Sequence, residues 1–128
     1  IIFNEKIKFK DIKSLWNSYY EKFLDLKVTN ESDGVLQDIH WYEGIFGYFP
    51  TYALGAMISS QIKYNCPFYN NFLSEPKFEN IKEIAHWLNK NIHQKASLYS
   101  SDEMLKEISG EKLNSNFFLK HLKDRFIN

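Results

Sequence analysis

Asp38, His40 and Trp41 form a compact group of residues that could take part in chemistry. Gln37 precedes the group, and Tyr48 follows it in a segment rich in aromatic residues. Polar side chains among so many rings must find hydrogen-bond partners or face a cavity, because a buried polar group without a partner costs about 1–3 kcal/mol. The residue types alone leave two interpretations open, a substrate-facing wall or a hydrogen-bonded network that fastens a loop to a helix.

The remaining histidines, His86, His93 and His121, carry weaker signals. His86 and His93 are spaced to share one face of a helix, and Glu83 precedes His86 in a Glu-x-x-His spacing. A di-metal carboxylate site needs such motifs from two helices, and this sequence offers one. We therefore predict solvated or capping histidines rather than metal ligands, and we expect His121 to lie on a lysine-rich surface.

Known catalytic motifs are missing from the sequence. It contains no His-Glu-x-x-His zinc motif, no Gly-x-Ser-x-Gly elbow, no phosphate-binding loop and no Cys/His pair at a catalytic spacing. Taken alone, the chain is predicted to hold no complete active site and no metal ligands. Cys66 is the single cysteine, which excludes an internal disulfide and a cysteine-based zinc cluster and favours a reduced, cytoplasmic setting.

Composition narrows the function classes further. The 16 basic and 16 acidic residues cancel, so a nucleic-acid backbone has no basic field to bind. Aromatic residues make up 17% of the chain, which predicts that some rings line a cleft or contact chain outside this sequence.

No charged residue occurs from residue 44 to residue 62, but Pro50, Ser59 and Ser60 make that stretch too polar for lipid. We predict a buried segment there and no membrane span.

Apolar residues recur at three- and four-residue intervals in several stretches, the period of an amphipathic helix. Pro50 suits the first turn of a helix, whereas Pro67 and Gly110 suit positions just after one. We expect Ser101 or Asp102 to be the N-cap of a later helix. The predicted helices cover residues 9–26, 50–64, 77–94, 101–108 and 114–126.

The helix after Pro50 carries small residues around much of its surface. Because small residues let neighbouring backbones approach closely, we expect this helix to be central and enclosed. No alternating run is long enough to predict a core strand. The predicted fold class is all-α, with at most a short ribbon between Trp41 and Tyr48.

The segment Gly34–Trp41, called the signature segment below, matches the pattern Gly-x-x-Gln-Asp-x-His-Trp. Residues 44–55 follow it with Gly-Ile-Phe-Gly-Tyr-Phe-Pro-Thr-Tyr-Ala-Leu-Gly. Both segments resemble the thermostable carboxypeptidase (carboxypeptidase Taq) family of metallocarboxypeptidases, and the resemblance extends over nearly the whole chain. Two positions depart from it, since Tyr42 replaces a small residue and Ala96 replaces a glycine that is common in the family.

The resemblance implies a helical, cleft-bearing zinc enzyme that removes single residues from the C-termini of peptides. The zinc ligands and a substrate-binding arginine motif of that family precede the part that this chain resembles. Residues 1–128 are therefore expected to be a single C-terminal helical segment, an expectation that the opening Ile1-Ile2-Phe3 without a methionine supports. Its implied partners are peptide substrates and the missing N-terminal portion, and the intact enzyme is implied to be a homodimer. The chain alone is predicted to be inactive.

The resemblance also suggests roles for individual residues. His40 and Tyr48 are the candidate catalytic residues, as hydrogen-bond donors to the oxyanion that forms opposite the zinc. The alternative for His40 is to hold the terminal carboxylate of the peptide. Gln37 and Asp38 are expected to orient the imidazole ring. Tyr52 is expected to lie behind His40 and Tyr48 in the substrate-binding wall. Trp41 and Phe46 are the pair expected to shape the pocket for the leaving residue.

A rival interpretation comes from a different class of protein. The chain would then be a non-catalytic helical interaction module whose aromatic surface binds a partner helix. In that case the signature segment is a structural network, and the full-length gene product contains no metal. The metal content of that product separates the two interpretations.

Overall fold

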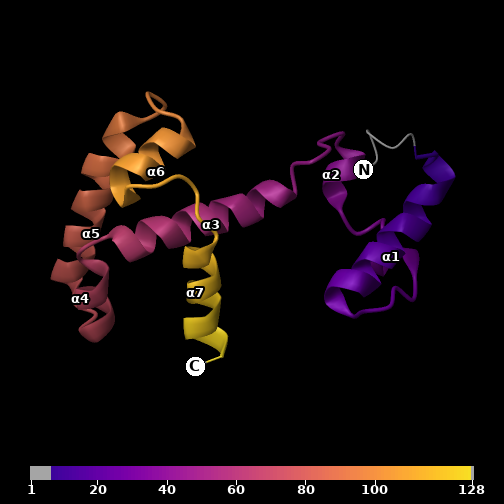
Figure 1. The fold of residues 1–128 in the computed structure, drawn as a ribbon, viewed down its shortest axis with the longest axis horizontal. Coiled ribbons are helices and arrows are strands. Elements are labelled where there is room, and N and C mark those ends of the chain that lie inside the picture. The colour runs from indigo at the N-terminus through magenta and orange to yellow at the C-terminus, as the bar shows by residue number, and fades with distance from the viewer. Residues whose placement is uncertain (1–6, 128) are drawn as a thin grey trace. The chain divides into compact units, whose positions relative to one another are not determined.

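The computed structural model describes residues 7–127 and divides the chain into two compact units, Ile1–Phe49 and Pro50–Asn128. Every regular element in the described range is helical, which confirms the predicted all-α class (Figure 1). Within the described range, no helix has the length and the apolar character that a bilayer crossing requires.

The first unit is built on one long helix. A 3-10 turn, η1 (Phe9–Asp11), leads into α1 (Ile12–Leu24), which ends where Asp25 takes a left-handed backbone conformation at φ 54°. The chain then turns through η2 (Glu31–Asp33), where the side chain of Asn30 accepts a hydrogen bond from the Asp33 N–H. The same N–H also donates to Asn30 O at 3.2 Å, so the side chain and the backbone of Asn30 together order the polar break after α1.

The ribbon predicted between Trp41 and Tyr48 does not form. The chain instead makes a single helical turn, α2 (Ile39–Tyr42), and then a series of tight turns. Gly44 and Gly47 have φ angles of 70° and 78°, a left-handed conformation that strains most other residues. These two glycines let the chain fold back on α2 where a strand pair would have to stay extended.

The second unit contains the remaining helices. Pro50 begins α3 (Pro50–Asn65), as predicted, and the extra helix α4 (Tyr69–Ser74) follows Pro67 within two residues. The prediction missed α4 because six residues are too few for a clear helical period. The later elements are α5 (Phe78–Asn91), η3 (His93–Lys95), α6 (Ser101–Ser109) and α7 (Asn116–Phe126).

Helix α3 is the centre of the second unit, where α6 and α7 both pack against it (Figure 1). The fully buried side chain of Gln61 ties these elements together. Its amide nitrogen donates to Ser109 Oγ at 2.7 Å and to Lys112 O at 3.1 Å, and its amide oxygen accepts from Asn114 N at 2.9 Å. One side chain therefore satisfies several backbone groups of the connection between α6 and α7.

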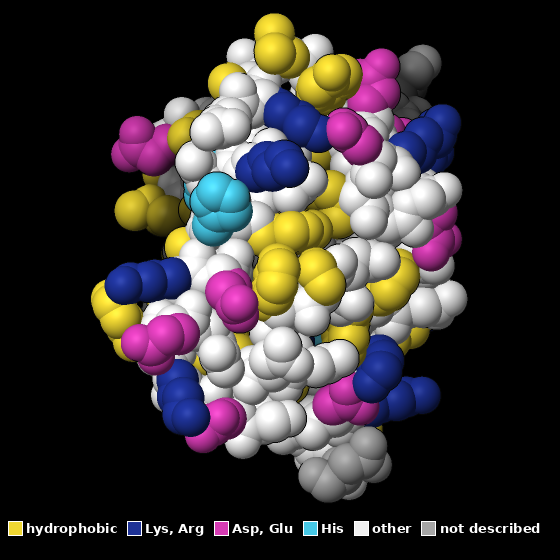
Figure 2. Space-filling view, turned by 90° about the vertical axis from the view of Figure 1, so that its left-hand side faces the viewer, with side chains coloured by type: hydrophobic (Ala, Val, Ile, Leu, Met, Phe, Trp, Pro, Cys, Tyr) yellow, Lys and Arg dark blue, Asp and Glu magenta, His cyan; other side chains and the backbone are white. Residues whose placement is uncertain are grey.

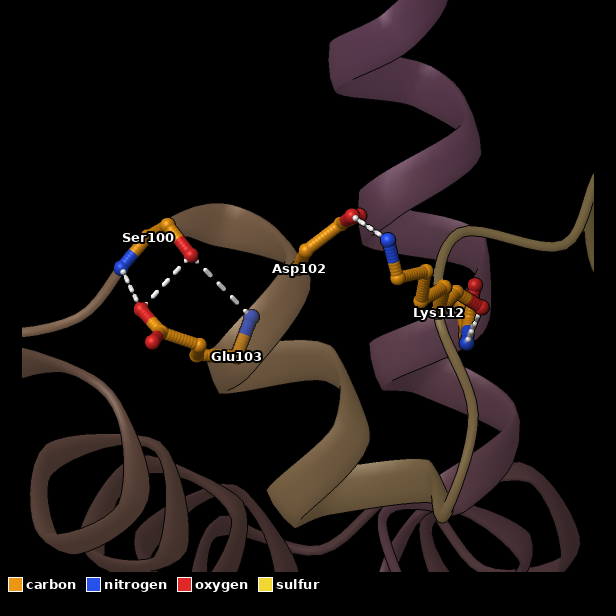
Figure 3. Close-up of polar contacts among 5 residues, drawn as sticks. Ser100, Asp102, Glu103 and Lys112 are labelled. Carbon is orange, nitrogen blue, oxygen red and sulfur yellow. Dashed lines mark hydrogen bonds and ion pairs between the residues drawn. The ribbon is translucent and has the colours of Figure 1, made fainter.

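The start of α6 is closed by a capping box, in which Ser100 rather than Ser101 or Asp102 is the N-cap (Figure 3). The Glu103 N–H donates to Ser100 Oγ at 3.3 Å, and the Glu103 carboxylate accepts from the Ser100 N–H at 2.8 Å. These hydrogen bonds from Ser100 lower the pKa of Glu103. Asp102 instead forms an ion pair with Lys112 at 3.0 Å, which joins α6 to the chain that follows it (Figure 3).

The interior of the described chain is small. In the second unit the buried side chains are Ser60, Gln61, Cys66 and Leu105. Helix α3 is central, as predicted, but within this chain it is not enclosed, since Tyr52 and Leu54 are 58% and 46% exposed. Many large apolar side chains in both units stay in contact with solvent.

Candidate functional site

Asp38 is the centre of the polar group in the first unit. It is the N-cap of α2, where its Oδ1 accepts a hydrogen bond from the His40 backbone N–H at 3.0 Å. The same oxygen lies 2.6 Å from His40 Nδ1, and Oδ2 accepts from the Trp41 indole N–H at 2.9 Å. One carboxylate therefore caps the helix and holds the two side chains that follow it.

The hydrogen bonds determine the ionisation of this group. Burial alone would raise the pKa of Asp38, but the hydrogen bonds from His40 and Trp41 outweigh it, and the pKa is lowered. An ionised carboxylate can only accept, so His40 Nδ1 carries a proton and donates it to Asp38. His40 Nε2 is consequently an acceptor in the neutral ring and a donor in the doubly protonated ring.

The turns after α2 bring two more rings to His40. The His40 carbonyl accepts from the Ile45 N–H at 2.8 Å, which folds the chain back over the helix. The Tyr48 ring then stacks on the imidazole with the centroids 5.3 Å apart, and the Phe49 ring lies at 5.5 Å. The side chains of His40 and Asp38 are only 15% and 10% exposed. The Asp38 carboxylate therefore holds Nδ1 of the imidazole, and the rings of Tyr48 and Phe49 pack against the imidazole ring.

Trp41 lies between two other aromatic residues. Its ring packs edge-on against Phe46 at 6.0 Å and against Trp16 of α1 at 5.8 Å. Phe46 is 55% exposed within this chain. The two residues expected to shape the pocket for the leaving residue are thus in direct contact.

The structure brings together five of the seven predicted site residues: Asp38, His40, Trp41, Phe46 and Tyr48. Gln37 is exposed, and its backbone N–H donates to Gly34 O at 3.0 Å. The predicted orientation of the imidazole therefore comes from Asp38 in this chain. Tyr52 lies on the first turn of α3 and belongs to the second unit.

A metal ion has no set of ligands in the part of the chain that the structure describes. No group of three or more His, Cys, Asp or Glu side chains comes together among residues 7–127. His86 and His93 are both exposed on α5 and η3. The residues present therefore do not fit a metal centre.

Two contacts of aromatic and basic residues were not anticipated. Trp16, more than twenty positions before Trp41, supplies a ring to the site, and no local pattern predicts such a long-range pair. His121 is half-buried rather than on an open surface, and its Nδ1 lies 2.9 Å from Lys63 Nζ. An ammonium group can only donate, so His121 accepts this hydrogen bond and links α7 to α3.

Comparison with known proteins identifies the family of the chain. Residues 1–126 match the model of the family described as carboxypeptidase Taq (M32) metallopeptidase. The chain is 34% identical over 131 residues to thermostable carboxypeptidase 1 of Pyrococcus furiosus, an alignment that covers 99% of the chain and 26% of the relative. It is 33% identical to carboxypeptidase 1 of Bacillus subtilis with the same coverage.

Solved structures are similar as well. The chain aligns with metallocarboxypeptidase 1 of Trypanosoma cruzi at a TM-score of 0.84 and 32% identity, covering 99% of the chain and 27% of that protein. An M32 carboxypeptidase of Deinococcus radiodurans aligns at a TM-score of 0.77 and 27% identity, covering 94% and 24%. The chain spans about a quarter of the length of the curated relatives it matches. With the family model covering residues 1–126, the chain belongs to the carboxypeptidase Taq (M32) metallopeptidase family.

Proposed function

We infer that the chain supplies one wall of the substrate cleft of a zinc metallocarboxypeptidase, an enzyme that releases residues from the C-termini of peptides. The observation that carries this proposal is the joint fixation of His40 by Asp38 and Tyr48 within the signature segment and its return turn. Family membership supports the reaction class, because the relatives are named as carboxypeptidases.

His40 is the proposed donor to the substrate. Since Nδ1 donates to Asp38, the remaining ring nitrogen, Nε2, can donate only when the ring is doubly protonated. The acceptor is either the oxyanion of the tetrahedral intermediate or the terminal carboxylate of the peptide. In both cases the donated proton is the one on Nε2.

Tyr48 is the second proposed donor, and its stacking on His40 couples the positions of the two side chains. Trp41 and Phe46 form an edge-on ring pair that suits the side chain of the leaving residue. We also assign Gln37 and Tyr52 to the substrate-binding wall. Both side chains are exposed within this chain, Tyr52 by 58%.

The zinc ligands are proposed to lie in chain outside this sequence, because residues 7–127 do not assemble a ligand set. The 128-residue chain alone should therefore release no amino acids from peptides. Purified chain should also hold no stoichiometric zinc in elemental analysis. Zinc-dependent turnover by this piece would contradict the proposal.

The remainder of the same polypeptide is the proposed partner of the exposed apolar surfaces. On the face that carries α4 and α5, hydrophobic side chains reach the surface among charged residues (Figure 2). Leu73 of α4 and Phe78 of α5 are 60% and 64% exposed. Such surfaces usually mark contacts with other protein. We further propose that the intact protein is a cytoplasmic homodimer.

The decisive experiment is His40→Ala in the intact protein, measured by steady-state kinetics next to a thermal melt. A donor to the oxyanion acts only as charge develops, so its loss should lower kcat about 10²-fold or more. A donor to the terminal carboxylate should instead raise KM. His93→Ala, an exposed histidine of η3, is the matched control and should leave both constants unchanged. Normal kinetics with a lower melting temperature would reduce His40 to a structural role and overturn the assignment.

Tyr48→Phe provides the companion test, because it deletes one hydroxyl group and keeps the ring that stacks on His40. Turnover should fall by about tenfold or more if the hydroxyl donates to the substrate. Tyr42→Phe makes the same chemical change at a nearby exposed position and should have no effect. Equal effects of the two changes would argue against a donor role for Tyr48.

A further inference from the structure

One face of α1 contacts the signature segment and the turn before it at three points. Lys13 forms an ion pair of 2.6 Å with Glu31, and the Trp16 ring packs edge-on against Trp41. Asn17 lies against Gly34, where its Oδ1 would be 3.5 Å from a Cβ atom placed on the glycine. These helix positions are spaced by three and four residues, so they form one surface. This surface, Lys13, Trp16 and Asn17, is called the α1 platform below.

Trp16 has the most direct connection from the platform to the proposed site. Its ring touches Trp41, the Trp41 indole N–H donates to Asp38 Oδ2, and Asp38 Oδ1 accepts from His40 Nδ1. Each of these contacts fixes the orientation of the next side chain in the series. A shift of the Trp41 ring would therefore change the direction of the Asp38 carboxylate and, with it, the plane of the imidazole.

The Trp16 ring, rather than its N–H group, makes the contact. Among the described residues, Trp16 Nε1 is buried and has no hydrogen-bond partner. An aromatic ring without an N–H group should therefore replace Trp16 with little loss, whereas a small side chain should not. Phe23, on the same helix, offers a useful contrast because it is 70% exposed and stacks on Tyr19 rather than on the signature segment.

We propose that Trp16 is a positioning residue for the substrate-binding wall and acts through Trp41 and Asp38 on His40. The inference rests on the proposed function, since it assigns Trp16 a role in placing the side chain that meets the substrate. Trp16 itself does not touch the substrate. A displacement of a reacting group by about 1 Å can cost about 10²-fold in rate, so a distant ring can matter strongly.

The test compares Trp16→Ala, Trp16→Phe and Phe23→Ala in the intact peptidase, with His40→Ala as the reference. Trp16→Ala should lower kcat/KM by about 10–10²-fold and change the pH profile of kcat/KM, because the Asp38–His40 pair loses its fixed geometry. Trp16→Phe should restore the activity to within about threefold. Phe23→Ala should match the wild type in rate and in pH profile.

A second measurement does not depend on turnover. Hydrogen exchange of residues 34–42, followed by mass spectrometry, should speed up in Trp16→Ala and stay unchanged in Trp16→Phe and Phe23→Ala. This measurement also covers the case in which the alanine variant is too unstable for kinetics. Faster exchange in Trp16→Phe would show that the N–H group has an essential partner, and it would overturn the assignment to the ring.

The outcomes separate the inference from the function on which it rests. If His40→Ala lowers activity and Trp16→Ala leaves kinetics and pH profile unchanged per folded molecule, Trp16 is structural and the inference is wrong. If His40→Ala leaves activity unchanged, the proposed function fails first and the inference fails with it. A loss in Trp16→Ala that phenylalanine rescues, together with the changed pH profile, supports the positioning role.

Discussion

The two units of the chain are organised around different kinds of polar side chain. In the first unit a partly exposed carboxylate, Asp38, gathers His40 and Trp41 within three residues of sequence. In the second unit a fully buried amide, Gln61, reaches groups 48 to 53 residues away. The first arrangement is local and charged, whereas the second is long-range and neutral.

This difference indicates a division of labour between the units. A neutral amide can be buried without leaving a charge unpaired, and it satisfies donors and acceptors of several elements at once, so it suits a structural joint. An ionised carboxylate beside an imidazole controls which ring nitrogen carries a proton, so it suits a surface that meets a substrate. We therefore expect Gln61 to matter for folding and Asp38 to matter for function.

Gln61→Ala should have the largest effect on stability. Removing the amide leaves Lys112 O and Asn114 N without their partners in the interior, which should cost about 3 kcal/mol or more. The melting temperature of the intact protein should fall, while kinetics per folded molecule stay normal. Gln94→Ala, an exposed glutamine, is the matched control and should change stability by less than about 0.5 kcal/mol. An equally small loss of stability in Gln61→Ala would contradict the expectation that Gln61 matters for folding.

Asp38→Asn should lower activity more than stability. The amide cannot accept from both His40 and Trp41, so the loss in stability should be about 1.5–3 kcal/mol at neutral pH. The sign of the pH dependence follows from the lowered pKa of Asp38. The wild-type carboxylate stabilises the fold above the pKa of an unfolded aspartate, and this contribution disappears as the pH falls through the folded-state value.

The measurement is a series of thermal melts of both proteins from neutral pH down to about pH 3. The difference in melting temperature between wild type and Asp38→Asn should shrink as the pH falls, because both side chains then lack a charge. A difference that stays constant over this range would show that the charge of Asp38 does not stabilise the first unit.

Gly34→Ala tests how closely the first unit is packed. A Cβ at this buried glycine would lie 2.7 Å from Val28 Cγ1, so the two groups must move apart at a cost of about 1–2 kcal/mol. The double variant Gly34→Ala with Val28→Ala should recover part of this loss, which a double-mutant cycle measures. Additive effects would mean that the clash with Val28 is not the cause.

Gly55→Ala is the corresponding change in the second unit. Within the described chain nothing lies within 4 Å of a Cβ at Gly55, and the residue is inside α3, so alanine should stabilise the isolated chain by about 0.5–1 kcal/mol. In the intact protein the same change should destabilise if the rest of the polypeptide packs on α3. Stabilisation in both forms would argue against docking at this part of the helix.

Ala96→Gly should give a small effect, and it should be favourable. Ala96 ends η3 with φ 45° and ψ −124°, a conformation that disfavours a residue with a Cβ atom. Glycine should raise stability by about 1 kcal/mol, because it adopts this conformation without the clash that a Cβ atom causes. Ala85→Gly makes the same substitution at an exposed position of α5 and should lower the free energy of unfolding by about 1 kcal/mol. It is the reference with which the melt of Ala96→Gly is compared. A loss in both variants would contradict the strain at Ala96.

Sequence alone was sufficient for the elements that depend on local interactions. Pro50 marked the start of α3, Gly110 marked the end of α6, and both positions were predicted. The bounds of α1 and α7 were predicted to within a few residues. Helical hydrogen bonds join residues four apart, so apolar period and capping residues within one stretch are enough to place a helix.

The signature segment allowed most of the candidate site to be predicted as well. Asp38, His40 and Trp41 are close in sequence. The one-turn helix α2 places the side chains of His40 and Trp41 around the Asp38 carboxylate. The prediction of a ribbon for the following turns was wrong, because the left-handed glycines Gly44 and Gly47 fold the chain back instead.

Tertiary structure alone decided the contacts between distant residues. Trp16 packs on Trp41, Gln61 joins α3 to the chain after α6, and Lys63 donates to His121 of α7. None of these pairs has a sequence spacing that a helix or a turn would impose. Their formation depends on which helix faces meet, and that choice follows from packing over the whole unit rather than from any single stretch.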